Sequence, residues 1–212
     1  MSGMPVEAVN VPREDIEWCD IWIPHANRAV HPRVLLIGDS ITRQYYPGVD
    51  RALQGKAYVA RLSSSRCVGD PVLTAEVTMV LQQYPFDIVH FNNGLHGFDV
   101  PEAEYDTHFG EYLALLQRLA PAAQLIWATT TPVRVADNLQ QLSPRNERVL
   151  ARNAIVQRHL ANRFPVDDLY SVCEHHAEYH ANDGVHYNEE GIAALAAQVA
   201  HCITDVLEAV SA

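Results

Sequence analysis

The chain has 212 residues, 48% of them hydrophobic, and no long charged or low-complexity tract, so it is large enough to bury the core of one domain. Its formal net charge of -11 opposes electrostatic binding to nucleic acid or to an anionic membrane surface. We therefore expect no nucleic-acid partner, no membrane partner, and small neutral molecules as ligands.

Residues 1–32 are polar and interrupted by prolines, which predicts an N-terminal strap packed on a domain formed by residues 33–212. The N-terminus lacks the basic start and apolar core of a signal peptide, and no apolar run elsewhere approaches the roughly 20 residues of a membrane span. We expect a cytoplasmic protein. Trp18 and Trp22 of the strap suit either core packing or stacking on a sugar ring.

Four short apolar runs each lead into a polar loop, as buried strands of a sheet do. They lie at residues 34–37, 56–62, 87–91 and 124–128. Between and after them come stretches with helical spacing, long enough to connect parallel strands, at residues 71–83, 104–120 and 146–164. A closing helix is expected over residues 188–210, because Asn188 is a candidate N-cap and two acids follow it.

This alternation of strand and helix predicts a single-domain, three-layer α/β/α fold with a central, mostly parallel sheet. In open sheets of this kind, ligands bind beyond the carboxyl ends of the strands. The polar loops that follow the four apolar runs lie at that edge. We therefore expect the functional site there.

Ser40 follows the first apolar run, in the sequence Gly38-Asp39-Ser40. Alone this is a weak signal, because serine after a strand more often forms a turn or caps a helix. Asp183 and His186 strengthen it, since they stand three residues apart in a glycine-containing loop before the closing helix. Asp183 can accept a hydrogen bond from His186 Nδ1–H, which leaves Nε2 free for a serine hydroxyl. We expect Asp39 to anchor nearby loops and not to join the triad.

Residues 34–42 and the sequence Asp183-Gly-Val-His186 resemble the first and last sequence blocks of the SGNH/GDSL hydrolase family, in the family's order. The resemblance covers roughly residues 33–200. It implies a flavodoxin-like fold and a catalytic triad, with Ser40 as nucleophile, His186 as base and Asp183 as its partner. It implies no metal and no other cofactor.

The oxyanion hole implied by this resemblance has two backbone donors and one side-chain donor, for which the sequence offers two candidates. The N–H groups of Ser40 and of Gly69, which lies in a segment similar to the family's second block, would be two donors. The third block departs from the family's G-x-N-D, because aligning Gly94 places His96 at the asparagine position and leaves Asn93 just before the glycine. Both side chains can donate, and we slightly prefer Asn93 because an amide donates at every pH. Its neighbour Asn92 is expected to close the loop.

The function implied by the resemblance is ester hydrolysis through an acyl-enzyme on Ser40. We favour removal of small acyl groups, especially O-acetyl groups of a carbohydrate, because no long apolar lid for lipid is evident. The expected partner is thus a small-molecule or oligosaccharide ester. The alternatives are a lysophospholipase or thioesterase of the same family, and a carbohydrate-binding protein with weakened catalysis, which the altered third block would favour.

The histidines of residues 174–186 raise the alternative of a zinc site, but their spacing matches neither H-E-x-x-H nor a finger pattern. Adjacent histidines also point in different directions on any regular element. We expect solvated loop histidines and no metal. The four cysteines are scattered without close pairing, and we expect buried free thiols.

Overall fold

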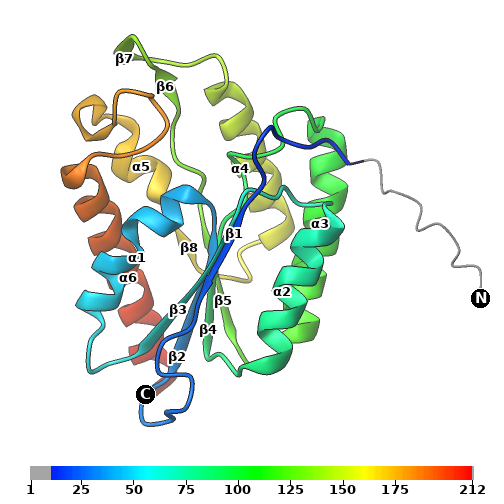
Figure 1. The fold of residues 1–212 in the computed structure, drawn as a ribbon, viewed down its shortest axis with the longest axis vertical. Coiled ribbons are helices and arrows are strands. Elements are labelled where there is room, and N and C mark those ends of the chain that lie inside the picture. The colour runs from blue at the N-terminus through cyan, green and yellow to red at the C-terminus, as the bar shows by residue number, and fades with distance from the viewer. Residues whose placement is uncertain (1–10, 212) are drawn as a thin grey trace, which may run out of the picture.

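The computed structural model describes residues 11–211. Residues 1–10 of the expected strap and residue 212 of the expected domain lie outside the described residues. Within the described part of the chain, a six-stranded sheet forms the centre of the fold and helices cover both of its faces (Figure 1). The expected three-layer α/β/α architecture is confirmed.

The sheet has the strand order β1-β3-β2-β4-β5-β8, and every neighbouring pair is parallel except β1 with β3. The four apolar runs of the sequence form the four central strands. Val34 lies opposite both Val59 and Ile88, so these strands run side by side to one common edge. The strands are β1 (Cys19–Trp22), β2 (Arg33–Gly38), β3 (Tyr58–Ser64), β4 (Ile88–Phe91), β5 (Gln124–Ala128) and β8 (Val166–Asp167).

Three helices cover each face of the sheet (Figure 1). One face carries α1 (Ser40–Ala52), α5 (Leu169–Glu174) and α6 (Glu189–Ser211), with a short 3-10 turn η1 (Ala177–Tyr179) beside α6. The other carries α2 (Pro71–Gln83), α3 (Glu102–Leu119) and α4 (Asn146–Leu160). Helix α4 ends four residues before the expected residue 164, because Ala161 adopts the left-handed conformation at φ 46°.

The strands are buried on both faces, which explains their continuous apolar sequences. Successive side chains of β2 enter opposite cores. Leu35 and Ile37 pack under α2, α3 and α4, whereas Val34 and Leu36 pack under α1 and α6. Strand β2 is therefore packed on both faces up to its end, which directly precedes Asp39 and Ser40.

The parallel strands have the order β3-β2-β4-β5-β8, which is the 2-1-3-4-5 order of flavodoxin-like folds. From β2 the chain passes through α1 on one face to β3, and from β3 through α2 on the other face to β4. The direction of winding therefore switches between β2 and β4. The crevice beyond the carboxyl ends of these two strands is where such folds bind ligands.

The described part of the strap contributes a strand of its own. Residues 11–18 contact the loops at the carboxyl edge of the sheet, and β1 then pairs antiparallel with β3. The returning turn is fixed by the buried Arg33, whose guanidinium donates to the carbonyl groups of His25 and Arg28 at 3.0 and 2.8 Å. The strap thus forms the edge of the sheet as well as a cover on the domain.

Several small elements were not expected from the sequence, among them β1, α5 and η1. Strand β8 is only two residues long, too short for a recognisable pattern, and the hairpin of β6 (Arg134–Val135) and β7 (Asn138–Leu142) is mostly polar and exposed. The hairpin rises beside α5 at the upper end of the molecule (Figure 1). Its strands pair residues only three to eight positions apart, but their polar sequence lacks the apolar alternation that indicates a half-buried strand.

Helix α6 corrects one expectation. From Glu189 to Val210 it is long and apolar enough, by length and composition, to cross a membrane. In the structure, Leu195, Val199 and Ile203 are buried against α1 and the sheet. The apolar side of this helix therefore belongs to the core of the domain.

Candidate active site

Ser40 is the first residue of α1 and stands at the switch point, directly beyond β2. Asp39 caps the helix, because its Oδ1 accepts a hydrogen bond from the N–H of Ile41 at 2.8 Å and its carbonyl oxygen accepts one from Arg43 at 3.0 Å. Asp39 has the anchoring position expected for it. The N–H of Ser40 forms no hydrogen bond with any described residue, and it lies at a helix N-terminus, which favours negative charge.

His186 lies between Ser40 and Asp183. Its Nε2 is 2.8 Å from Ser40 Oγ, and its Nδ1 is 2.6 Å from Asp183 Oδ2. The other carboxylate oxygen of Asp183 accepts hydrogen bonds from the N–H groups of Val185 and His186 at 2.9 and 2.8 Å. The structure thus brings together the three residues that the sequence predicted as a triad, and Asp183 fixes both the ring and the backbone of the histidine.

The Asp183 carboxyl group is held in its charged form. Burial raises its pKa, but the hydrogen bonds from the His186 ring and from two backbone N–H groups outweigh burial and leave the pKa below its ordinary value. A charged Asp183 favours the tautomer with a proton on Nδ1 of His186. Nε2 is then free to accept the Ser40 proton.

Arg134 of β6 supports the loop that carries Asp183 and His186. Its N–H donates to the carbonyl oxygen of Gly184 at 2.7 Å, and its buried guanidinium donates to carbonyl groups of β7 and α5. Gly184 has φ +72°, and a Cβ there would lie 2.3 Å from the carbonyl oxygen of Arg134, so a glycine is required. The contact spans fifty residues of sequence, which hid Arg134 from the sequence analysis.

Gly69 follows β3, the strand next to Ser40's own. Its φ is +91°, and a Cβ would meet the ring of His108 at 2.5 Å, so this position also requires glycine. Its N–H forms no hydrogen bond with the described residues. Unengaged N–H groups at Ser40 and Gly69 therefore lie at the ends of adjacent strands, as a backbone oxyanion hole needs.

Asn93 is buried and bound to the loop that carries Gly69. Its Nδ2 donates to the carbonyl oxygen of Arg66 at 2.8 Å, and its Oδ1 accepts a hydrogen bond from the N–H of Val68 at 3.1 Å. Nδ2 has a second N–H, which no described residue accepts. This places a candidate side-chain donor beside the Gly69 loop. Asn92 turns away from it, toward the carbonyl oxygen of Ala128 at 2.7 Å, and closes the loop as expected.

His96 lies farther out, against the strap. Its Nδ1 is 2.8 Å from Glu14 Oε1, and its ring meets that of Trp18 edge-on at 6.3 Å between centroids. Arg43 lies over the Trp18 ring on the side of α1. The ring of His96 is therefore engaged with the strap, whereas Asn93 contacts the Gly69 loop, and this geometry favours Asn93 as the third donor.

A buried arginine that the sequence analysis did not single out holds this third loop in place. Arg152 of α4 is fully buried and donates to the carbonyl oxygens of Gly94, His96 and Gly97 at 3.1, 2.7 and 2.6 Å. Its guanidinium also lies over the Tyr105 ring, 4.6 Å from the centroid. Within residues 11–211 it forms no ion pair. The loop is thus built around a buried guanidinium whose direct acceptors are carbonyl oxygens.

The sequence does carry a signal for Arg152. It stands at helical spacing from Val149 and Val156, which are both buried, so an arginine occupies the apolar side of α4. A charged residue on a buried helix face needs acceptors nearby. The position of Arg152 therefore indicates that carbonyl groups of a neighbouring loop face the buried side of α4.

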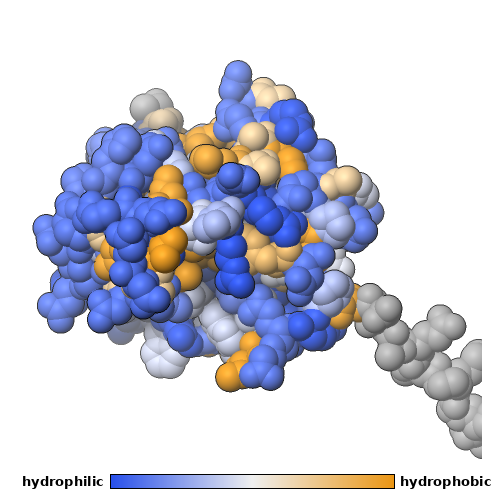
Figure 2. Space-filling view, turned by 90° about the horizontal axis from the view of Figure 1, so that it is seen from above, coloured by the Kyte–Doolittle hydropathy of each residue, from blue (hydrophilic) through white to orange (hydrophobic). Residues whose placement is uncertain are grey.

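A hollow of about 450 Å³ reaches Val185, the residue before His186, although Ser40, Asp183 and His186 do not line it. Figure 2 looks onto this face of the molecule, which is mostly hydrophilic with apolar patches between the polar groups. The apolar part of the lining comes from Leu95, Phe98, Val133 and Val185, and the polar part comes from Arg13, Glu14, Asp15, His96, Asp99 and Arg145. The strap thus supplies one wall of the hollow.

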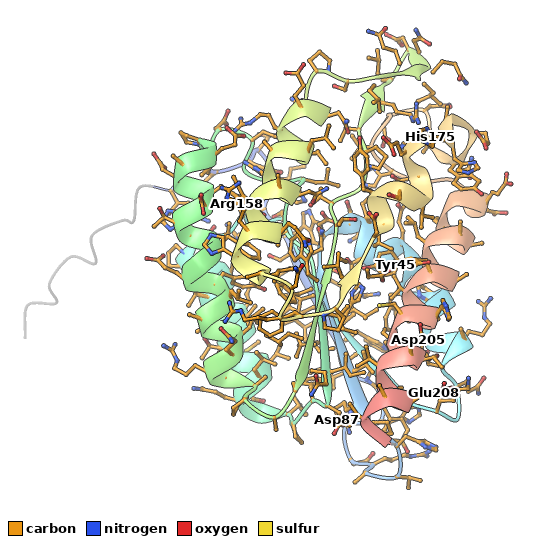
Figure 3. All side chains as sticks on the ribbon, turned by 180° about the vertical axis from the view of Figure 1, so that it is seen from behind. Tyr45, Asp87, Arg158, His175, Asp205 and Glu208 are labelled. Atoms are coloured by element: carbon orange, nitrogen blue, oxygen red, sulfur yellow. The ribbon has the colours of Figure 1, made fainter. Side chains whose placement is uncertain are left out.

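The histidine-rich segment does not converge on one point. His176 pairs with Glu178 at 2.7 Å, and the His180 ring faces the carbonyl oxygen of Pro132 at 3.3 Å. His175 lies exposed at the upper end of the molecule (Figure 3). Among residues 11–211, no group of three or more His, Cys, Asp or Glu side chains is placed to hold a metal ion.

All four cysteines are free thiols, but only some are buried. Cys67 and Cys173 are buried, and burial raises the pKa of each to about 11. Cys202 is half-buried and Cys19 is exposed on the edge strand β1, so the expectation of buried thiols was wrong for Cys19. An edge strand leaves one side of its residues open to solvent.

No family model and no curated protein matches the chain. Solved structures do match it. A carbohydrate esterase family 3 structure from Talaromyces cellulolyticus has a TM-score of 0.66 and 16% identity, over 84% of this chain and 98% of the other. The acetylxylan esterase Axe2 from Geobacillus stearothermophilus has a TM-score of 0.64 and 18% identity, over 81% and 94%.

A GDSL-like lipase from Bacteroides thetaiotaomicron VPI-5482 is also similar, with a TM-score of 0.60 and 16% identity over 82% of this chain and 88% of the other. The likenesses extend over most of each chain at low identity. They therefore establish a shared fold, and the chemistry must be argued from the site.

Proposed function

We propose that this chain, which has the SGNH/GDSL hydrolase fold, is a serine ester hydrolase whose nucleophile is Ser40. The observation that carries the proposal is the unbroken chain of contacts from Asp183 Oδ2 through the two ring nitrogens of His186 to Ser40 Oγ, at 2.6 and 2.8 Å. An imidazole in hydrogen-bond reach of a hydroxyl, and oriented by a carboxylate, is the arrangement that activates a serine.

In the proposed reaction, His186 Nε2 takes the Ser40 proton as Oγ bonds to the ester carbonyl carbon. The negative charge on the carbonyl oxygen is stabilised by the N–H groups of Ser40 and Gly69 and by the amide of Asn93. The C–O bond to the alcohol then breaks, and the alcohol leaves with the proton from His186. Water attacks the acyl-enzyme by the same route and releases the carboxylic acid and free Ser40.

Polar groups around the hollow support a small acyl group on a hydroxylated alcohol as substrate. Charged side chains such as Arg13, Glu14 and Arg145 border it, and a long acyl chain would have to displace water from them at a cost. A sugar replaces that water with hydroxyl groups. Two of the similar structures are named for carbohydrate esters, which agrees with O-acetyl removal from a carbohydrate.

The test is covalent labelling followed by a substrate series. A fluorophosphonate probe should label the wild-type protein and fail to label Ser40→Ala, which keeps the fold because the hydroxyl serves only the chemistry. With 4-nitrophenyl esters, kcat/KM should fall abruptly beyond acetyl or propionyl. Absence of labelling would remove the proposal, whereas rates that rise with acyl length would favour a lysophospholipase or thioesterase.

A further inference from the structure

A second hollow, of about 440 Å³, lies at the far end of α1 from Ser40. Its walls come from β1, the turn that follows it, the last turns of α1 and the start of β3. Asp50 in its wall stands ten residues after Ser40 on the same helix, a separation of about 15 Å along the helix axis. This hollow is therefore separate from the triad and from the hollow beside it.

Aromatic rings form much of the lining. Trp22 stands at the end of the edge strand β1 and is 57% exposed, so core packing does not account for it. Tyr46 of α1, Tyr58 of β3 and His25 complete the aromatic part, and the His25 and Tyr58 rings lie 5.0 Å apart between centroids. A large exposed ring beside a hollow offers a flat apolar face to a ligand.

Polar side chains without partners stand among these rings. The side chains of Asp50, Arg51 and Gln54 form no hydrogen bond or ion pair with any residue between 11 and 211. Partial burial raises the pKa of the Asp50 carboxyl, and the nearby His25 lowers it in part. A carboxylate, a guanidinium and an amide thus line the hollow with hydrogen-bonding capacity that no described residue uses.

We propose that this hollow is a carbohydrate-binding site that holds a neutral pyranose unit away from the reacting ester. The C–H face of a pyranose is apolar and fits against Trp22, whereas its hydroxyl groups both donate and accept. The carboxylate of Asp50 accepts from such hydroxyls, and Arg51 and Gln54 donate to them. The site needs no chemistry at Ser40 and is independent of the proposed ester hydrolysis.

The charges around the hollow favour a neutral ligand over a charged one. A cationic ligand would compete with arginines already on the rings, since Arg61 lies 4.7 Å from the Tyr46 centroid and Arg33 lies 5.6 Å from that of Tyr58. An anionic ligand that paired with Arg51 would also meet the carboxylate of Asp50, the next residue in the same wall. A polyhydroxylated neutral molecule avoids both penalties.

Binding is measured without turnover in the Ser40→Ala background, by isothermal titration with xylohexaose, cellohexaose and chitohexaose. At least one of these should bind, and Trp22→Ala should weaken that binding about tenfold or abolish it. Asp50→Asn should weaken it less. Met79→Ala is the matched control, because Met79 is 46% exposed on α2, away from the hollow, and its removal should change nothing. A thermal melt of each variant verifies folding.

Two outcomes overturn the proposal: none of the three oligosaccharides binds, or the affinity and stoichiometry of binding are unchanged in Trp22→Ala. Activity provides an independent readout in the otherwise wild-type enzyme. Trp22→Ala should leave hydrolysis of 4-nitrophenyl acetate unchanged and should raise KM for an acetylated oligosaccharide. If the enzyme hydrolyses no ester at all, the proposed function fails, while the binding result still decides this inference.

Discussion

The two loops that meet Ser40 are held in opposite ways. In the loop of Asp183 and His186, the hydrogen bonds between these two residues join positions at most three apart, both side chains are partly exposed, and one longer-range backbone hydrogen bond from Arg134 holds Gly184. In the loop that follows β4, Asn93 and its neighbours are buried and are held by Arg66 and Arg152, which are distant in sequence. The first loop orients its own functional side chains through local hydrogen bonds, whereas the second loop depends on partners from other elements for the placement of Asn93.

This difference predicts that residues that carry out the reaction and residues that hold the site in shape respond differently to substitution. A change in the self-contained loop should remove reactivity and leave folding nearly intact. A change in the supported loop should lower stability together with the rate, because its polar groups are buried and need their partners. The predictions below test this division.

The largest effect is expected in the self-contained loop. His186→Ala should lower kcat by roughly 10³- to 10⁶-fold, because no other described residue is placed to take the Ser40 proton. Its free energy of unfolding should stay close to wild type, since the ring is partly exposed. Steady-state rates on 4-nitrophenyl acetate and a urea titration measure both. A variant with wild-type turnover would eliminate His186 as the base.

Asp183→Asn should cost less activity, on the order of 10²- to 10⁴-fold, because it disturbs the tautomer of His186 but leaves the base present.

Asp183→Asn should also change the pH dependence of the free energy of unfolding. The depressed pKa of Asp183 adds stability above the ordinary range of an aspartate, which is lost as pH falls through the folded-state pKa. The stability advantage of wild type over Asp183→Asn should therefore shrink below about pH 4. An advantage that grows on acidification would contradict this assignment.

Asn93 and His96 can be compared directly as oxyanion donors. Asn93→Ala should lower kcat by about 100- to 1000-fold with a small change in KM, because the hydrogen bond strengthens only as charge develops on the carbonyl oxygen. His96→Ala should lower it much less, since its ring is engaged with Glu14 of the strap. The reverse order would identify His96 as the donor. If both variants keep near-normal kcat, the backbone groups of Ser40 and Gly69 suffice.

Arg152→Met tests the support of the second loop. It removes the donors to three buried carbonyl groups and should lower the free energy of unfolding by about 2–4 kcal/mol, with a fall in kcat as the loop loosens. Arg158→Met is the matched control on the same helix (Figure 3). The Arg158 side chain is 63% exposed and pairs with Asp106. Its cost should stay below about 1 kcal/mol. Equal costs in the two variants would refute the role given to Arg152.

The smallest effect is expected at the strap. Glu14→Gln weakens an exposed contact with His96 and should change stability by less than about 1 kcal/mol. Because Glu14 also lines the hollow beside His186, KM for an oligosaccharide ester should change more than kcat. Kinetics on an acetylated oligosaccharide compare the two constants. A change confined to kcat would place Glu14 in the reaction and not in substrate binding.

What the sequence could predict follows the same division. An apolar run such as Val34–Ile37 indicates a strand that is buried on both faces. The spacing of Asp183 and His186 indicates a contact within one loop. Both features can therefore be predicted from a single sequence. The support from Arg134 and Arg152 is not, because each joins segments about fifty residues or more apart. The same reason explains why β1 was not predicted, since its residues pair with residues of β3 that lie 39 to 45 positions later in the sequence.

The direction of α6 determines which end of the chain is better suited for immobilising the protein on a solid support. This helix begins three residues after His186 and has 23 residues, so it is about 35 Å long and carries the chain away from the end of the molecule where Ser40 lies. Attachment beyond α6 would leave the polar upper face turned toward the solution. Attachment ahead of Pro12 would instead crowd a wall of the hollow beside His186 and slow the entry of large esters first.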